Sequence, residues 1–377
     1  MGVRTAAYAY PWDLNGDPRA AERFAELGID AVVLAAAYHS VRAATPRHPR
    51  HRVVDARSAA LYMPVRADAW GELIPADASP WAGERSFTRA AGELRLVGLP
   101  VRAWVVLTHS TAVGLANPWA CVRNAFGDVY PYALCPSVPA VRDYSRRLVG
   151  EVVRQSGVTD VVLEACGPMG VNHLGHHEKT AGADWTEDEC ALLSICFCDA
   201  CTTSLAQADV DPAELAARIR SGGSSPAKVL GPHLDVVLQI RSEATRLLRE
   251  AVLAEARSAG AVGIAMHAVA DAWSTGPAAA VTVADKGVNS YVVPAWELDE
   301  VAAQRVGAMR ALGVDVSAYV NVLPPAPADP EELARYWRGL VAAGAEELHL
   351  YHAGLASDRR LAALRMAIED VTGKVRR

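Results

Sequence analysis

Eight short apolar segments recur along the chain, and most are preceded by an amphipathic stretch rich in alanine and arginine. Their composition and alternation predict β-strands at residues 4–10, 29–39, 100–109, 158–165, 261–268, 288–295, 315–323 and 346–353. Several of the amphipathic stretches end in a glycine, as helix C-termini favour, namely Gly28, Gly98, Gly313 and Gly344. Buried strands that alternate with helices form parallel sheets covered on both faces. Eight such units predict a (β/α)8 TIM barrel.

An open doubly wound sheet is the alternative fold. That fold predicts a glycine-rich phosphate loop after the first strand, and the sequence YPWDLNGDP there contains none. The connections after the second, third and fourth predicted strands are much longer than the usual few residues. We therefore expect one barrel domain over residues 1–377 with long insertions at the rim where the strands end, including a zinc-binding and helical segment at about 166–258.

The charge balance limits the partners of the protein. With 377 residues, 51% of them hydrophobic and 21% charged, the chain has the composition of a globular protein. The net charge of -6 and the isoelectric point near 6.0 provide no basic surface for nucleic acid. No apolar run is long enough to cross a membrane, and the N-terminus lacks the apolar core of a secretory signal. We expect a cytoplasmic protein with reduced thiols, and the sequence leaves a homo-oligomer open.

Aromatic, imidazole and polar side chains recur where the predicted strands end, which in a barrel is one mouth. Aromatic faces beside hydrogen-bonding groups suit a carbohydrate-like small molecule. Each residue alone is more often structural, but their recurrence at one end favours a site. The candidate substrate-binding residues are Tyr8, Tyr10, Trp12, His39, His109, His176, His177, His267, Trp296, Tyr319, Asn321 and His352.

Glu164 interrupts the apolar strand VVLEA. An ionised carboxylate in such a strand is costly, so either an inward Arg or Lys pairs with it or its pKa is raised. Desolvation raises the pKa of a carboxyl group and keeps it protonated near neutral pH, which suits a general acid. The following loop, GPMGVNHLGHHEK, contributes His176 and His177 for substrate binding, or for a metal, although it lacks the H-x3-H spacing of a zinc protease helix.

Three of the seven cysteines, Cys196, Cys198 and Cys201, lie in the short sequence CFCDAC. Closely spaced thiolates suit a tetrahedral zinc ion, which needs a fourth ligand. Cys135, in a proline-rich loop, is our preferred fourth ligand, and Cys190 is the alternative. Without a metal these residues would be small apolar fillers.

These motifs together resemble a known family. The segment FGDVYPYALCPS with Cys135, the strand VVLEA with Glu164, and CFCDAC resemble the zinc-bearing β-galactosidases of glycoside hydrolase family 42 and the wider set of glycoside-hydrolase-like barrels. The resemblance covers roughly residues 100–205. It implies a structural Zn2+ held by the four cysteines, with Glu164 as the general acid/base of a glycosidase.

The sequence departs from that family at the second carboxylate. The family has its nucleophilic glutamate at the end of strand seven, where this chain has Asn321. Cleavage of a glycosidic bond needs a second carboxylate, for which we predict Glu297 first and Asp271 second. Two other functions stay open: a metal-dependent small-molecule hydrolase or isomerase that uses His39, His109, His267 and His352, and a non-catalytic sugar-binding barrel.

Overall fold

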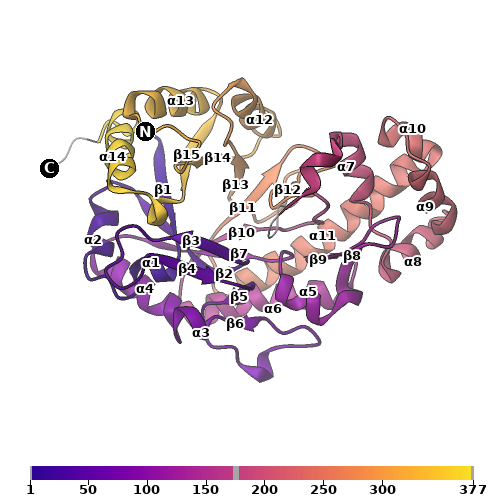
Figure 1. Ribbon diagram of the computed structural model, residues 1–377, viewed down its shortest axis with the longest axis horizontal. Helices are drawn as coiled ribbons and strands as arrows, with labels where there is room; N and C mark the ends of the chain where they lie inside the picture. Colours follow the sequence, from indigo (N-terminus) through magenta and orange to yellow (C-terminus); the bar gives the residue numbers. More distant parts are fainter. Residues whose placement is uncertain (1, 173–177, 375–377) are drawn as a thin grey trace.

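A closed ring of eight parallel strands forms the centre of the protein, in a computed structural model that describes residues 2–172 and 178–374 (Figure 1). The strand β1 pairs in parallel with both β2 and β15, which closes the ring. The predicted (β/α)8 barrel is confirmed, and each predicted strand overlaps one strand of the ring. In ring order the strands are β1 (Arg4–Ala9), β2 (Ala31–Tyr38), β7 (Val101–Val106), β10 (Asp160–Glu164), β11 (Gly263–Val269), β13 (Ser290–Pro294), β14 (Val316–Asn321) and β15 (Ala345–Tyr351).

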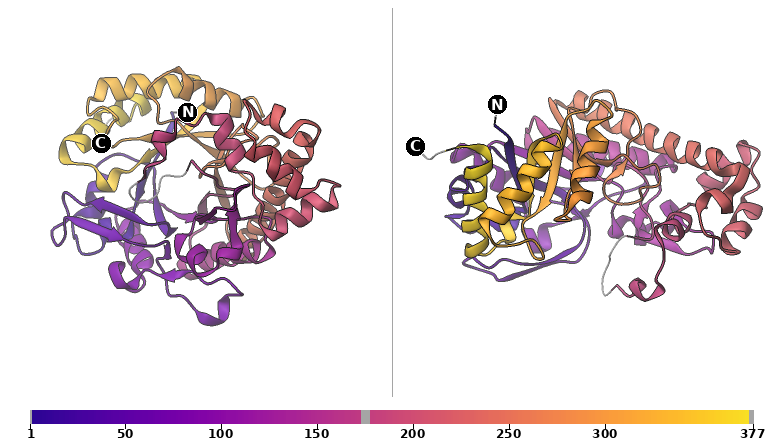
Figure 2. Two further views of the ribbon diagram at one scale, coloured as in Figure 1. Left: turned by 45° about the vertical axis from the view of Figure 1, so that its right-hand side comes forward. Right: turned by 90° about the horizontal axis from the view of Figure 1, so that it is seen from above.

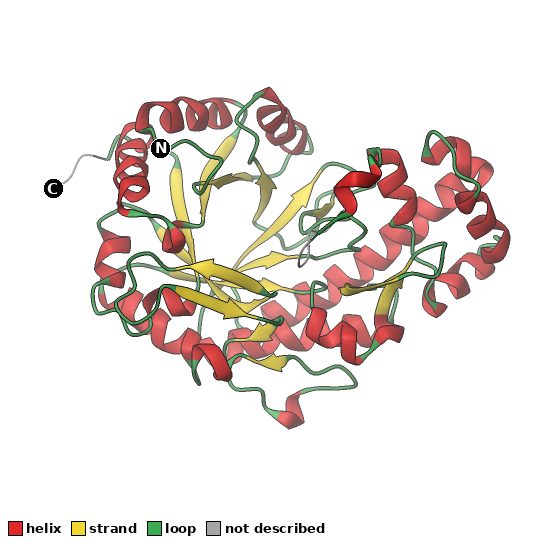
Figure 3. Ribbon diagram, in the orientation of Figure 1, coloured by secondary structure: helices red, strands yellow, loops and turns green. Residues whose placement is uncertain are grey.

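Helices cover the outside of the ring (Figure 3). The main ones are α2 (Ala20–Ala25), α4 (Ser86–Leu96), α6 (Pro139–Ser156), α11 (Leu234–Ala259), α12 (Glu300–Arg310), α13 (Pro330–Ala342) and α14 (Asp358–Thr372). The glycines predicted near helix ends have positive φ, from 74° at Gly28 and Gly313 to 113° at Gly344, with 81° at Gly98. Glycine adopts this left-handed conformation without the steric cost of a Cβ atom, so the predicted helix ends are confirmed.

The connections after β2, β7 and β10 carry additional elements. After β2 come a β3 (Val41–Ala44) and β4 (Val53–Ala56) hairpin, the short strands β5 (Ala60–Leu61) and β6 (Ala76–Asp77), and α3 (Ser79–Ala82). After β7 come α5 (Thr111–Ala116) and the antiparallel pair β8 (Cys121–Arg123) and β9 (Val129–Leu134). After β10 come α7 (Glu187–Leu193), α8 (Asp199–Gln207), α9 (Pro212–Arg220) and α10 (Pro226–Leu230).

The helices α8, α9 and α10 extend away from the barrel, at the right of Figure 1 and in the right-hand view of Figure 2. Together with α7 they share a small hydrophobic core apart from that of the barrel, which includes Leu192, Leu205, Leu215, Ile219 and Leu230. The long helix α11 begins beside this core and packs along α6 on the barrel wall.

Polar side chains line part of the barrel interior. Side chains two residues apart on a strand lie on the same face, so Glu347, His349 and Tyr351 of β15 follow one another toward the mouth. Arg102 and Trp104 of β7 are also two residues apart, so they lie on one face with Trp104 nearer the mouth. The interior therefore has a charged layer near the start of the strands and an aromatic layer near their ends. Within the described part of the chain, no helix is both long enough and apolar enough to cross a membrane.

Candidate functional site

Glu164 ends strand β10 and is buried in the barrel mouth. Its Oε2 accepts a hydrogen bond of 2.8 Å from the indole Nε1–H of Trp104, and His267 Nε2 lies 3.9 Å from the same oxygen. Burial raises the pKa of Glu164 to about 7, although the Trp104 bond acts in the opposite direction. Among the described residues, this carboxyl group bonds an indole and not an arginine. Its raised pKa agrees with the prediction made from its place in an apolar strand.

The backbone changes direction directly after Glu164. Ala165 has a φ of 56°, in the left-handed region. That conformation costs an alanine roughly 1–2 kcal/mol, and such strain gathers at functional sites.

A chain of buried polar groups leads from this carboxyl group toward the start of the strands. Tyr8 Oη lies 3.0 Å from His267 Nε2 and 2.9 Å from His349 Nδ1. His349 Nε2 is 3.6 Å from Glu347 Oε2. Arg102 reaches both oxygens of Glu347, at 2.8 and 3.0 Å.

The charge states along this chain follow from burial and from the ion pair. Burial lowers the pKa of both His267 and His349, so the two imidazoles are neutral. Burial also acts to raise the pKa of Glu347, but the polar N–H group of neutral His349 and the positive charge of Arg102 hold that pKa well below its usual range. The chain therefore begins at an ionised pair, Arg102 with Glu347, and ends beside Glu164, a carboxyl group whose pKa burial raises to about 7.

Aromatic rings surround Glu164 and Trp104. Trp104 packs on Tyr8 with ring centroids 4.7 Å apart and on Tyr38 at 4.3 Å. At the outer edge Trp296, 45% exposed, stacks on Tyr351 at 5.3 Å with an interplanar angle of 18°. Tyr319, another of the predicted binding residues, is only 6% exposed because it packs against Tyr8, His267 and Tyr351.

Other predicted binding residues at the start and end of the chain form a buried stack. Tyr10 packs between Trp12, at 4.4 Å, and His352, at 4.2 Å, and all three are buried. Burial lowers the pKa of His352 to about 3. These rings support the wall of the mouth and offer little surface to a ligand.

The histidines do not form one group. His39 stacks on His109 at 4.3 Å, whereas His267 bonds Tyr8 and His352 packs on Tyr10. Over residues 2–172 and 178–374, the group of side chains that could hold a metal ion consists of cysteines. His176 and His177, which we predicted to bind substrate, lie outside the described residues.

The two predicted second carboxylates make local interactions. Glu297 is exposed and forms a bidentate ion pair with Arg305, with N–O distances of 2.9 and 3.1 Å. Arg305 lowers the pKa of Glu297, which is therefore ionised. Asp271 is exposed and accepts the backbone N–H of Trp273, and Asn321 accepts that of Leu323, each at 2.9 Å. The role of each residue stays a prediction.

Asp13 is a mouth residue that the sequence analysis missed. It lies in α1 (Pro11–Leu14), directly after β1, and is buried. Its Oδ2 accepts the backbone N–H of Tyr10 at 2.8 Å and lies 3.9 Å from His352 Nδ1. Burial raises the pKa of Asp13 to about 7. The sequence signal that could have found Asp13 is the one that identified Glu164: an acidic residue within an apolar segment at the end of a strand.

The four cysteines come together as predicted. The sulfurs of Cys135, Cys196, Cys198 and Cys201 all lie within 4.8 Å of one another, and Cys190 is not part of the group. The sulfurs of Cys135 and Cys201 are 3.6 Å apart. Tetrahedral zinc–thiolate sites have sulfurs about 3.8 Å apart, given a Zn–S distance of about 2.3 Å. The backbone N–H groups of Arg123 and Cys198 point to Cys196 Sγ at 3.5 and 3.4 Å, so the donor set fits a metal ion.

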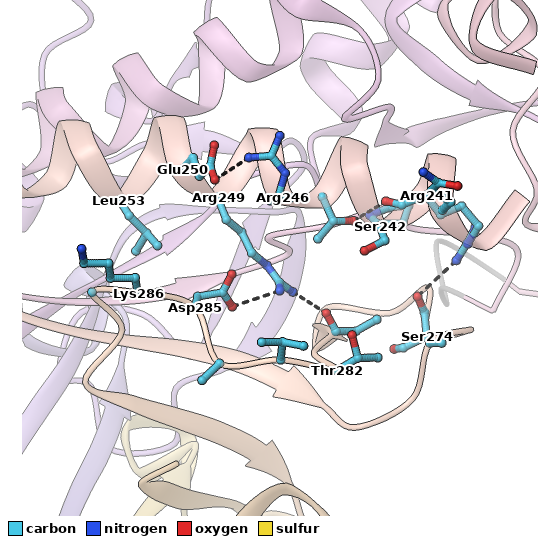
Figure 4. Close-up of a pocket in the computed structure, with 18 of the residues that line it drawn as sticks. Arg241, Ser242, Arg246, Arg249, Glu250, Leu253, Ser274, Thr282, Asp285 and Lys286 are labelled. Atoms are coloured by element: carbon cyan, nitrogen blue, oxygen red, sulfur yellow. Dashed lines mark hydrogen bonds and ion pairs between the residues drawn. The ribbon is translucent and has the colours of Figure 1, made fainter. Parts of the chain in front are cut away.

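A separate cavity of about 980 Å³ lies outside the barrel, between α11 and the segment after β11 (Figure 4). Two of its arginines form ion pairs with carboxylates of the protein. Arg249 pairs with Asp285 at 3.1 Å and donates to Ala280 O at 2.7 Å, while Arg246 pairs with Glu250. Neither Glu164 nor the aromatic rings of the mouth line this cavity, so it is separate from the candidate site.

Comparisons with known proteins bear on the fold. No protein-family model matches the sequence, and no curated protein sequence matches it significantly. Among solved structures, the chain is similar to α-L-fucosidase isoenzyme 2 from Paenibacillus thiaminolyticus, with 12% identity and a TM-score of 0.60 over 98% of this chain and 49% of that one. It is similar to the catalytic domain of β-amylase from Paenibacillus polymyxa, with 10% identity and a TM-score of 0.58 over 98% of each chain.

A third similar structure is the β-galactosidase from the psychrophilic Marinomonas ef1, with 11% identity and a TM-score of 0.55 over 97% of this chain and 59% of that one. The chain thus spans about half of the fucosidase and nearly all of the β-amylase catalytic domain. At these identities the likeness establishes a barrel of the kind found in glycoside hydrolases.

Proposed function

We propose that the protein is a glycoside hydrolase that cleaves a glycosidic bond of a carbohydrate or a sugar-derived metabolite at the barrel mouth. The observation that carries this proposal is Glu164, a buried carboxyl group at the end of a barrel strand with a pKa of about 7. Such a group is protonated in a large fraction of molecules at neutral pH and can donate to a leaving oxygen. The barrel type of the similar structures supports the proposal.

Glu297 serves as the second carboxylate, with Asp271 as the alternative. The Arg305 pair keeps Glu297 ionised, while burial keeps Glu164 partly protonated. Two carboxyl groups with pKa values displaced in opposite directions fit an acid and a base or nucleophile. Glu297 has to leave part of its Arg305 pair to face the substrate, and its exposure makes that change inexpensive.

The exposed face of Trp296, backed by Tyr351, provides the surface for a sugar ring. Its indole is open to solvent, while the ring behind it holds it in place. An apolar sugar face packs on such a surface and its hydroxyl groups bond the polar groups nearby.

The test is the Glu164→Gln variant, assayed with one substrate that has a poor leaving group and one activated aryl glycoside. Loss of the proton donor should lower turnover of the first by roughly a hundredfold or more and affect the second much less. Glu243→Gln, at an exposed helical glutamate, is the matched control and should leave both rates unchanged. Equal small effects on both substrates would contradict the role of Glu164.

Other results of the same assay would favour the other functions. Tight binding of a sugar without turnover indicates a non-catalytic sugar-binding barrel. Activity that depends on an added metal ion, and that survives Glu164→Gln, indicates a metal-dependent hydrolase or isomerase.

The four-cysteine cluster holds a structural zinc ion in this proposal. Cys135, Cys196, Cys198 and Cys201 supply four sulfurs and no open position for a water molecule, which is the pattern of a structural site. Zinc there would link the loop after β9 to α8, and the likeness of these motifs to glycoside hydrolase family 42 supports this assignment. Elemental analysis of the purified protein should find about one zinc ion per chain.

A further inference from the structure

His267 lies between two hydrogen-bond acceptors inside the barrel. Its Nε2 is 3.0 Å from Tyr8 Oη and 3.9 Å from Glu164 Oε2. The side chain is buried, with no access to solvent for its N–H group. A buried N–H group without an acceptor costs about 1–3 kcal/mol, so this nitrogen is expected to bond one of the two oxygens at any time.

The hydrogen-bond direction follows from the charged end of the chain. Glu347 is ionised, and its Oε2 lies 3.6 Å from His349 Nε2, slightly beyond hydrogen-bond distance; its negative charge favours the neutral tautomer of His349 that has the proton on Nε2. Nδ1 of His349 is then an acceptor, and Tyr8 donates its hydroxyl proton to it at 2.9 Å. The oxygen of Tyr8 therefore accepts from His267, whose Nε2 must carry a proton.

The polar groups near Glu164 are uncharged. Trp104 from β7 donates to it, and His267 from β11 lies beyond hydrogen-bond distance. Burial raises the pKa of four tyrosines near Glu164, with a smaller contribution from that carboxylate, so their hydroxyl groups stay protonated; these are Tyr8 of β1, Tyr38 of β2, Tyr319 of β14 and Tyr351 of β15. No described cation contributes to its titration. Beside the Trp104 bond, the N–H group of His267 is a second neutral donor close enough to turn to the carboxylate once it forms.

We propose that His267 and Tyr8 are positioning residues for Glu164: the Nε2–H of His267 bonds Tyr8 while Glu164 is protonated, and turns to Glu164 when that carboxyl group is ionised. The proposal rests on the proposed function, because it assigns these residues a part in the cycle of the general acid. No covalent bond forms or breaks in this exchange. The N–H group changes its acceptor from a phenol oxygen to a carboxylate oxygen, and the ionised Glu347–Arg102 pair keeps the correct nitrogens protonated throughout.

Two substitutions should shift the titration of Glu164 in opposite directions. In Tyr8→Phe the His267 N–H group loses its first acceptor and turns permanently to Glu164, which favours the carboxylate and should lower its pKa by about one unit. In His267→Leu the carboxylate loses this donor, and its pKa should rise by about one unit or more. His267→Gln keeps an N–H donor and should titrate closer to the unsubstituted protein than His267→Leu.

Infrared titration of the protonated carboxyl band measures these shifts directly. The band of Glu164 is the one absent from Glu164→Gln, and thermal melting checks that each variant is folded. Tyr62→Phe is the matched control, because Tyr62 is also buried but packs against Trp12, and it should leave the Glu164 titration unchanged.

Opposite shifts in the two variants support the proposal. Shifts in the same direction, or no shift in either variant, overturn it. If Tyr8→Phe does not fold, the comparison of His267→Leu with His267→Gln decides, since equal titrations in those two variants also overturn the proposal. The measurement needs no substrate, so absence of glycosidase activity would refute the proposed function and leave this test intact.

Discussion

Replacement of Glu347 by Gln should destabilise the barrel strongly, although Glu347 lies away from the mouth. The Glu347 side chain is 4% exposed and Arg102 is 19% exposed, and two N–O contacts of 2.8 and 3.0 Å join them. Removal of one partner of a buried ion pair costs about 3–5 kcal/mol, because the other charge stays buried without compensation. The partial exposure of Arg102 and the absence of a volume change place the expected loss near the lower value, about 3 kcal/mol.

The magnitude can be measured by urea unfolding followed by circular dichroism. A matched control is Asp370→Asn, which removes a surface pair with Arg338 of similar length, 2.7 Å, but with side chains 52% and 49% exposed. That variant should lose less than about 1 kcal/mol. The double variant Arg102→Met with Glu347→Leu should recover most of the stability, since apolar side chains can replace a buried ion pair.

The loss should also depend on pH. The folded pKa of Glu347 lies below the value of 4.5 of an unperturbed glutamate, so its ionised form stabilises the folded state above that pH. As the pH falls below about 4.5 the unfolded chain takes up the proton first, and the difference between the unsubstituted protein and Glu347→Gln should shrink. A loss as small as that of Asp370→Asn, or one that grows in acid, would refute a buried ionised pair.

Three further predictions concern the mouth, the cysteines and Asp13. Trp296→Ala should weaken sugar binding, measured by calorimetry, with little change in melting temperature. Tyr319→Ala should lower the melting temperature as well, because Tyr319 is buried. Equal decreases in melting temperature in the two variants would contradict this prediction. Cys198→Ser, or removal of zinc with a chelator, should lower the melting temperature more than it changes any substrate constant. Asp13→Asn should be more stable than the unsubstituted protein at pH 8 and no more stable at pH 3. The folded pKa of Asp13 is about 7 and the ordinary value is 3.8, so the stability of the unsubstituted protein falls as the pH rises between these two values. An unchanged pH dependence of unfolding in the variant would contradict this prediction.

The sequence determined the barrel and the cysteine cluster. Strand and helix periodicity depends on local residue order, and eight buried parallel strands with their helices have few other ways to close. The run of Cys196, Cys198 and Cys201 fixes three sulfurs within one turn, so one further cysteine, Cys135, completed the group. Glu164 was predictable because a carboxyl group in an apolar strand ends up buried wherever that strand lies in the sheet.

Only the tertiary structure decided which side chains meet inside the ring. Tyr8, His267 and His349 come from three strands separated by up to 341 positions, and their contacts depend on strand stagger, which no local pattern encodes. Strand stagger also decides that Arg102 meets Glu347, and that Trp296 is exposed while Tyr319 is buried. A one-residue difference in register exchanges inward and outward side chains, so local order can predict that a strand exists, while the closed sheet decides what each of its side chains touches.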